Sequence, residues 1–333
     1  MAPPVSVLDR PAAAERARFA PATALFAPPA PHRRSGAGEV HAHHGEIVQG
    51  AFYSADGTLE QALVTLPCSL YRSRARFRPL RSGPLTVEPA GCTKARDAAR
   101  LTLEVLGRPG WGGSIRIDSN VPVSWGCGSS TTDVLATIRA VADAFDAELP
   151  PEWAARLAVA SEVASDSLMY APDRAVLFAQ RRGSVLQDLG GPLPAVHVLG
   201  FNTEVDRGVE TLSLPPCRYS GWEVEAFGPI LGLLRRAVQE QDPRLLGRVA
   251  SASTAINQRH RPKRHMTEIT ALARETGAAG VQVAHSGTVA GLLFEPGREA
   301  AERMHHARTR LQRLGLVRTW HFATQPNQPE VLS

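Results

Sequence analysis

The chain has 333 residues, which is enough for two compact lobes or for one large domain with a substantial core. Its composition, 43% hydrophobic and 21% charged, excludes a collagen, a coiled coil and a wholly disordered chain. A formal net charge of +5 spread over this length makes no concentrated basic patch, so nucleic acid is not the favoured partner.

Residues 1–37 are rich in proline, alanine and arginine and show no steady hydrophobic period. They are predicted to form a disordered N-terminal extension. An N-terminal lobe is expected over residues 38–195, and its first half has the pattern of strands with turns. Short apolar elements with tight glycines occur at 39–52, a buried strand is predicted at 63–66, and an alternating strand at 114–118.

The hydrophobic period changes at Ser130, where apolar residues begin to recur on one helical face and predict a long helix. Ser130 and Asp133 have the spacing of a capping box, in which the acid also favours the helix dipole. Pro150 and Pro151 end this unit, and a second helix is predicted over residues 152–165. The first of these helices therefore begins directly behind a glycine-rich turn.

A C-terminal lobe is expected over residues 196–333. Its pattern predicts helices at 223–241, 243–255, 266–276 and 298–314, and strands at 281–284 and 291–294. Helices and strands interleaved in this order are typical of an α+β lobe.

The chain shows no membrane or disulfide signal. It contains no run of roughly 18 uninterrupted apolar residues and opens with no signal-peptide pattern, so a cytoplasmic protein without a membrane partner is expected. The four cysteines are widely spaced and form no CxxC pair, which argues against a disulfide framework or a zinc ribbon. They are interpreted as buried or incidental thiols.

The segment most informative about chemistry is PVSWGCGSSTTD, at residues 122–133. Its glycines allow the backbone to approach a ligand closely, its serines offer hydroxyl groups, and the helix that follows points its free amides at the loop. Phosphate is the ligand that such a loop favours, and a glycine turn with a serine cap is the structural alternative. The chain contains no Walker A motif, no GxGxxG and no protein-kinase signature.

The pattern PxxxGxxSS followed by a helix resembles the phosphate loop of the superfamily of galactokinase, homoserine kinase, mevalonate kinase and phosphomevalonate kinase, the GHMP kinases. GEIVQG at 45–50, INQ at 256–258 and GVQVAHSGT at 280–288 narrow the resemblance to its L-threonine kinase branch, associated with cobalamin side-chain synthesis. The SSTxD continuation of the phosphate loop is also similar to that branch. The resemblance implies a two-lobed α/β (α+β) fold with an N-terminal nucleotide-binding lobe and a C-terminal ferredoxin-like α+β lobe.

The activity that the resemblance implies is ATP- and Mg²⁺-dependent phosphorylation of the side-chain hydroxyl of an amino acid, with L-threonine as the first choice of acceptor. The residues that it assigns to nucleotide binding are Pro122, Gly126, Cys127, Gly128, Ser129, Ser130 and Thr131.

Two carboxylates follow the phosphate loop. Glu162 and Asp166 would share one face if the predicted helix continued through both. The resemblance implies that Asp166 accepts or orients the proton of the attacking hydroxyl, and that Glu162 and the Ser130 hydroxyl hold Mg²⁺. Phosphoryl transfer needs an oriented alcohol and charge neutralisation, which these groups could supply. The alternative is two carboxylates on a solvated helix face.

Contacts with the amino-acid substrate are expected from two turns and one helix. Glu46 offers a carboxylate for an ammonium group, and Gln49 an amide for a polar group; a polar turn is the alternative. The turn at 285–288 lies between two apolar strands, and a strand turn with a satisfied histidine is the alternative to a site that lines the amino-acid or phosphate pocket. The full expected set is Glu46, Gln49, Asn257, His285, Ser286, Gly287 and Thr288.

Two further clusters carry open interpretations. His41, His43 and His44 could suggest a metal site, but no carboxylate or cysteine partner is obvious, so the metal interpretation is not favoured. The run RHRPKRH at 259–265 is the densest positive cluster. Its interpretations, in order of preference, are a solvated loop, a lid that contacts nucleotide phosphates and a nucleic-acid contact.

The sequence thus predicts a kinase whose partners are ATP, Mg²⁺ and a small hydroxylated amino acid, with a homodimer left open. A kinase for homoserine, another hydroxylated amino acid or an amino alcohol is the nearest alternative. A noncatalytic member of the fold and a basic nucleic-acid-binding protein are the alternatives of other classes.

Overall fold

The computed structural model describes residues 35–204 and 217–325. The predicted N-terminal extension lies almost wholly outside these residues. Strand β1 (Gly36–Tyr53) begins two residues before the expected start of the N-terminal lobe. Within the described ranges, no helix is both long enough and apolar enough to cross a membrane.

A single sheet of ten strands runs through the described part of the chain. After β1, its strands are β2 (Leu59–Leu80), β3 (Leu85–Glu88), β4 (Gly112–Ser119), β5 (Val176–Ala179), β6 (Ser184–Asp188), β7 (His197–Asn202), β8 (Gly280–Val283), β9 (Val289–Phe294) and β10 (Thr319–Ala323). Their spatial order is β10-β7-β9-β8-β1-β2-β4-β3, with β5 paired to β2 and β6 to β5. β1 therefore joins the two halves of the sheet, because it pairs with β2 on one side and with β8 on the other.

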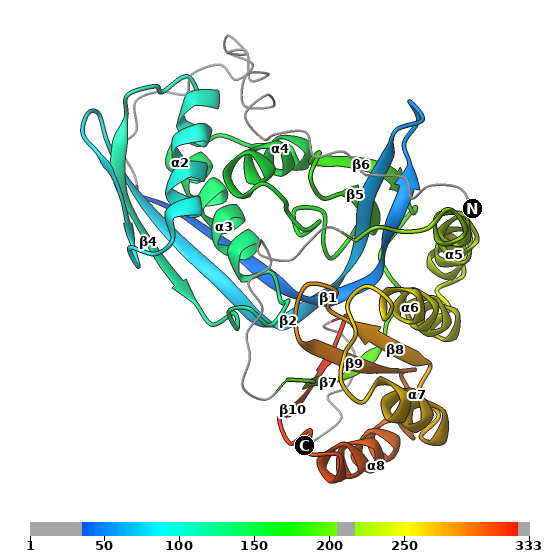
Figure 1. The fold of residues 1–333 in the computed structure, drawn as a ribbon. Coiled ribbons are helices and arrows are strands. Elements are labelled where there is room, and N and C mark those ends of the chain that lie inside the picture. Colours follow the sequence, from blue (N-terminus) through cyan, green and yellow to red (C-terminus); the bar gives the residue numbers. More distant parts are fainter. Residues whose placement is uncertain (1–34, 205–216, 326–333) are drawn as a thin grey trace.

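Helices cover this sheet in three groups, which Figure 1 shows along the molecule. They are α2 (Thr93–Val105), α3 (Ser129–Ala144), α4 (Pro151–Glu162), α5 (Gly221–Glu240), α6 (Pro243–Asn257), α7 (Met266–Glu275) and α8 (Ala300–Arg313). α2, α3 and α4 pack over the first half, α5 and α6 lie against β1, and α7 and α8 cover β7 and β8. The result is a mixed α/β fold, as predicted.

Strands β7, β8 and β9 are buried on both faces. In β9, Leu293 packs with α5 and α6, while its neighbour Leu292 packs with α7 and α8. Successive side chains of a strand point to opposite faces, so a strand between two helical layers needs apolar residues at nearly every position. This explains why the predicted strand at 291–294 is an unbroken apolar run.

Three local expectations are wrong. The capping box does not form, because Gly128 is the N-cap of α3 and the Asp133 carboxylate instead accepts a hydrogen bond of 2.6 Å from the Ser73 hydroxyl. The second helix, α4, ends at Glu162, and Val163 turns the chain with a φ of +74°. Glu162 and Asp166 therefore do not share a helical face. The first half also contains a helix, α2, where only strands and turns are expected.

In the C-terminal half, every predicted helix and strand occurs, with ends within a few residues of those expected. The division between lobes at residues 195 and 196 stays a prediction, since β1 and β8 join both halves in one sheet.

Candidate active site

The phosphate loop has an unusual backbone. Ser124, Gly126 and Gly128 all have positive φ angles, of 65°, 84° and 73°. Gly128 is the left-handed N-cap of α3, and no side chain caps this helix start. The first-turn amides of α3 are therefore directed at the loop without a capping side chain, which is the arrangement that binds phosphate at a helix N-terminus.

The loop is held against the turn at 285–288, more than 150 residues further along the chain. The carbonyl of Trp125 accepts hydrogen bonds from the amides of Thr288 and Val289, at 2.9 and 3.1 Å. A Cβ atom added at Gly126 would lie 2.8 Å from the Cα of Gly287. Because the two backbones touch, glycine is required on both sides of this contact. The structure thus brings two of the predicted segments together.

The remaining loop residues contribute in different ways. Cys127 is buried, and burial raises the pKa of its thiol, but its carbonyl accepts a hydrogen bond from the His43 amide. Pro122 and Ser129 are partly exposed along the loop and the start of α3.

Glu162 lies at the start of α3, although it comes from the end of α4. The Ser130 hydroxyl donates to Glu162 Oε2 at 2.8 Å, and the Thr131 hydroxyl donates to Oε1 at 2.9 Å. Burial raises the pKa of Glu162 to about 7, and the Asp166 charge acts in the same direction, while the two hydroxyls oppose it. A carboxylate beside a serine hydroxyl is an oxygen donor set of the kind that Mg²⁺ prefers, so the residues fit that ion.

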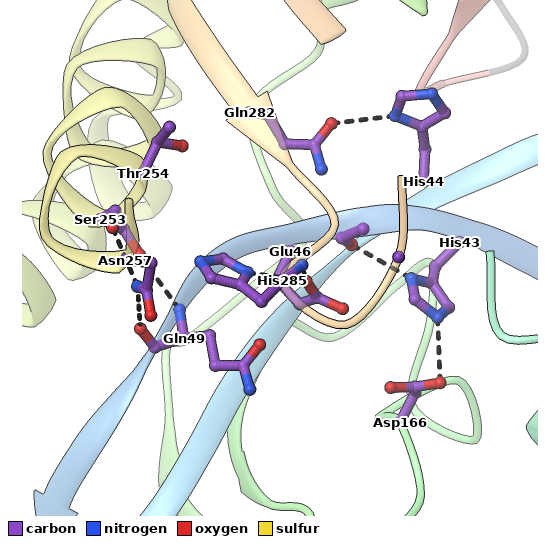
Figure 2. A network of polar contacts seen from close by, with 12 residues as sticks. His43, His44, Glu46, Gln49, Asp166, Ser253, Thr254, Asn257, Gln282 and His285 are labelled. Atoms are coloured by element: carbon purple, nitrogen blue, oxygen red, sulfur yellow. Dashed lines mark hydrogen bonds and ion pairs between the residues drawn. The ribbon is translucent and has the colours of Figure 1, made fainter. Parts of the chain in front are cut away.

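The partly exposed Asp166 forms a pair with the buried His43 of β1 (Figure 2). His43 Nε2 lies 2.9 Å from Asp166 Oδ2, and its Nδ1 lies 3.1 Å from the carbonyl oxygen of Gly45. Both partners are acceptors, so the ring donates from both nitrogens. Burial disfavours the imidazolium, but the Asp166 carboxylate, the Glu46 charge and the Gly45 carbonyl together outweigh it and raise the pKa of His43 to about 9. Burial likewise opposes the Asp166 charge, yet His43 keeps the pKa of this carboxyl below its usual value.

The His43–Asp166 pair touches the phosphate loop. A Cβ atom at Gly128 would lie 2.5 Å from His43 Nε2 and 3.1 Å from Asp166 Oδ2. An ionised carboxylate is therefore placed directly beside the start of α3, where a phosphate group would bind.

Irregularities in β1 place these side chains. The pairing of β1 with β2 shifts register at three places: between His41 and Ala42, once before Glu46 and once after it. Gly45, next to Glu46, has a φ of +63°. Such bulges redirect side chains next to active sites. His44 has partners different from those of His43: its Nδ1 donates to Gln282 Oε1 at 2.9 Å. Burial lowers the pKa of His44 to about 4.

The three histidines do not form a metal site together, but the expectation that they lack a carboxylate is wrong for His43. One atom each of His43, Glu46 and Asp166 lie within 4.8 Å of one another. Since both nitrogens of His43 act as donors, this group is interpreted as an ion-pair network and not as metal ligands.

Glu46 lies between Asp166 and the turn at 285–288. Its Oε2 accepts hydrogen bonds from the His285 amide and from His285 Nδ1, at 2.9 and 2.8 Å (Figure 2). All of these groups are buried. In the same turn, Ser286 is partly exposed, and the buried Thr288 hydroxyl has no hydrogen-bond partner among the described residues.

The side chain of Asn257 contacts the backbone of Gln49. The amide of Asn257 donates to the carbonyls of Gln49 and Ser253, at 2.8 and 2.9 Å, and its oxygen accepts from Tyr219 at 2.7 Å. Both amide hydrogens of Asn257 are thus used within the protein. Its contribution to a substrate site would be indirect, by holding β1 against α6.

The basic run at 259–265 divides into two parts. Arg259 pairs with Glu223 at 3.2 Å, and Arg264 pairs with Glu204 at 3.9 Å; both arginines are exposed. Lys263 instead turns inward, and its Nζ donates to the carbonyl of Gly287 at 2.5 Å. Two arginines of this run are thus paired with carboxylates.

Three residues at the site are absent from the expected site residues: His43, which is considered only as a metal ligand, Lys263, which is considered only within the basic run, and Lys94. Lys94, at the start of α2, is near enough to Glu162 for its charge to lower the pKa of that carboxyl. One signal was available, because Lys94 and Lys263 are the only two lysines among the 37 basic residues of the chain.

Comparison with known proteins relates this chain to one family of kinases. The family model "GHMP kinases N terminal domain" matches residues 93–172, and "GHMP kinases C terminal" matches residues 234–310. An L-threonine kinase of Salmonella typhimurium is 28% identical over 213 residues, covering 63% of this chain and 69% of its own. An L-threonine kinase of Citrobacter freundii is 32% identical over 194 residues, covering 55% of this chain and 64% of its own.

Solved structures share the fold. A homoserine kinase from Cytophaga hutchinsonii superposes with a TM-score of 0.61 at 15% identity, covering 86% of this chain and 93% of its own. A mevalonate kinase from L. major, in complex with R-mevalonate, gives 0.59 at 17% identity, covering 90% and 98%. Both support the two-lobed fold expected from the sequence.

Proposed function

This chain belongs to the GHMP kinase superfamily and is a phosphotransferase that acts on a hydroxyl group, and from that premise we propose that it phosphorylates the side-chain hydroxyl of an amino acid, L-threonine first. ATP is the proposed donor. One observation carries the proposal: the ionised and partly exposed Asp166 lies against the N-cap of α3, beside the phosphate loop. The part in cobalamin side-chain synthesis suggested by the resemblance stays a prediction.

The phosphate loop would bind the nucleotide phosphates through the backbone. The first-turn amides of α3 and its dipole favour a negatively charged group at this point. Ser130 and Glu162 would hold Mg²⁺, which neutralises charge on the phosphates when it is bound. Lys94 adds a second positive charge near Glu162. The start of α3 thus supplies most of the groups that stabilise the transferred phosphoryl group.

Asp166 would orient the acceptor. The hydroxyl oxygen forms a bond to the γ-phosphorus, the bond from that phosphorus to the ADP oxygen breaks, and the hydroxyl proton passes to the Asp166 carboxylate. His43 holds this carboxylate in its charged form and in a fixed position. Positioning of this kind supplies much of the catalysis of phosphoryl transfer, which needs little covalent chemistry from the protein.

The amino-acid acceptor is supported by Glu46 and by the relatives. The Glu46 carboxylate lies close to Asp166, so it could bind the ammonium group of an acceptor whose hydroxyl meets Asp166. The relatives from Salmonella typhimurium and Citrobacter freundii are L-threonine kinases. Homoserine, serine and amino alcohols carry the same two groups, and for that reason they are the competing acceptors.

A substrate panel tests the proposal. ADP release is measured with ATP and L-threonine, L-serine, L-homoserine or 1-amino-2-propanol, with Mg²⁺ and again with EDTA. We expect Mg²⁺-dependent release that is fastest with L-threonine. Fastest release with another acceptor would reassign the substrate, and no release with any of the four would refute the proposed activity.

A further inference from the structure

The side chain of Lys263 reaches into the site, although the proposed phosphoryl transfer does not use it. It lies in the loop between α6 and α7, and its own amide donates to Gln258 Oε1 at 2.7 Å. Its Nζ donates to the carbonyl of Gly287 at 2.5 Å and contacts that of His285 at 3.5 Å. The ammonium group is therefore fixed at the turn that holds Glu46 on one side and the phosphate loop on the other.

The charge of Lys263 is incompletely balanced. Burial lowers the pKa of Lys263 to about 8, with the Glu46 and Glu204 charges opposing that effect and Arg261 adding to it. Glu46 already accepts two hydrogen bonds from His285. An ammonium group has three hydrogens to donate, and two carbonyl oxygens lie within 3.5 Å of this one. One donor is thus left for a third partner, on a side chain that is only partly exposed.

The residue type is informative as well. Arginine supplies nearly all the positive charge in this chain, and Lys263 is one of only two lysines. A compact ammonium directs its three donors from one atom to two converging carbonyls and a third partner, whereas a guanidinium spreads its donors over a rigid plane. The composition and the contacts thus agree that this position needs an ammonium group.

We propose that Lys263 binds the α-carboxylate of the amino-acid acceptor, so that it determines the preference for amino acids over amino alcohols. This inference rests on the proposed function. Threonine carries its hydroxyl on Cβ, and its ammonium and carboxylate groups on the neighbouring Cα. Asp166, Glu46 and Lys263 follow one another in the corresponding order, since Glu46 lies within 4.8 Å of Asp166 and is joined through His285 to the carbonyl that Lys263 contacts.

The test compares two acceptors on two enzymes. L-Threonine and (R)-1-amino-2-propanol differ in the carboxylate alone, so the ratio of their kcat/KM values measures what the carboxylate contributes. We expect the wild type to prefer threonine, and Lys263→Met to reduce this preference about tenfold or more, as for a hydrogen bond between charged groups. Lys94→Met removes the other lysine, whose charge lies near Glu162, so it should slow both acceptors alike and leave their ratio unchanged.

Each result is decisive. An unchanged preference in Lys263→Met, with both acceptors slowed equally, would mean that Lys263 only supports the turn, and it would overturn the inference. A wild type with no preference for threonine would overturn it too. If Lys263→Met does not fold, Lys263→Gln is measured in the same way. If the wild type phosphorylates neither acceptor, the proposed function fails instead, and calorimetric binding of L-threonine to wild type and Lys263→Met then decides the role of Lys263.

Discussion

The buried His43 and the partly exposed Asp166 form an ion pair whose two members depend on each other. Removing Asp166 would leave the His43 charge uncompensated in the interior, which costs more than the pair itself contributes. Glu46, on the same strand as His43, adds a second negative charge that favours the imidazolium. The pair therefore links the chemistry of the site to the stability of the fold.

This link predicts a pH dependence of stability. The pKa of His43 rises from about 6.5 to about 9 on folding, so the stabilisation is complete below about pH 6.5 and is lost as the pH rises through about 9. Over that window the free energy of unfolding of the wild type should fall by about 3 kcal/mol relative to His43→Gln. Urea unfolding of both proteins from pH 6 to 10 measures it. Parallel pH curves would show that the ion pair does not form.

Gly128 tests the contact between the pair and the phosphate loop. In Gly128→Ala the new Cβ would meet the His43 ring and Asp166, so we expect kcat to fall about tenfold or more. Gly110→Ala is the matched control, because Gly110 has a similar φ of +81° and open space around its Cβ position. Both variants should lose about 1–2 kcal/mol of stability from the left-handed backbone. Equal kcat values in the two variants would contradict the proposed contact.

At the scale of elements, Asn257 joins α6 to β1. Asn257→Ala would leave the buried Gln49 carbonyl and the Tyr219 hydroxyl without partners, so we expect a loss of about 2 kcal/mol in the free energy of unfolding. Denaturant unfolding measures this loss, and the KM for L-threonine provides the comparison. A raised KM with unchanged stability would instead show that Asn257 contacts the substrate directly.

The elements with a strong hydrophobic period could be predicted from the sequence. The long helix after the glycine turn and the four helices of the C-terminal half are confirmed, because their buried faces alone produce the period. α2 is absent from the predicted elements, and its buried face consists of three alanines with Thr102 and Leu103. The early end of α4 depends on a distant contact, the hydrogen bond of 2.9 Å from the Ser165 amide to the Gln180 carbonyl.

The same distinction applies to the site. The phosphate loop is a continuous stretch of sequence, so its resemblance to the loop of a known family could predict it. The His43–Asp166 and Lys263–Gly287 contacts join residues far apart in the chain, and no local pattern indicates them. The roles of all the site residues stay predictions until they are measured.

At the scale of the whole molecule, the site lies where one strand passes between the two halves of the sheet. β1 pairs with β2 along most of its length, and with β8 at Glu46. The first half contributes the phosphate loop, Glu162 and Asp166, and the second half contributes His285 and Lys263. The bulges of β1 turn His43 and Glu46 toward these groups. Neither half alone therefore contains all the groups proposed for phosphoryl transfer.

The most direct test of this account is a single-turnover measurement of product formation. Enzyme in excess is mixed with limiting Mg²⁺-ATP and with L-threonine, and O-phospho-L-threonine is followed by mass spectrometry for the wild type and for Asp166→Asn. We predict that the wild type forms the product and that Asp166→Asn forms it about 100-fold more slowly or worse, with nucleotide affinity largely kept. A wild type that forms no phosphothreonine, or an Asp166→Asn variant that forms it equally fast, would contradict the account.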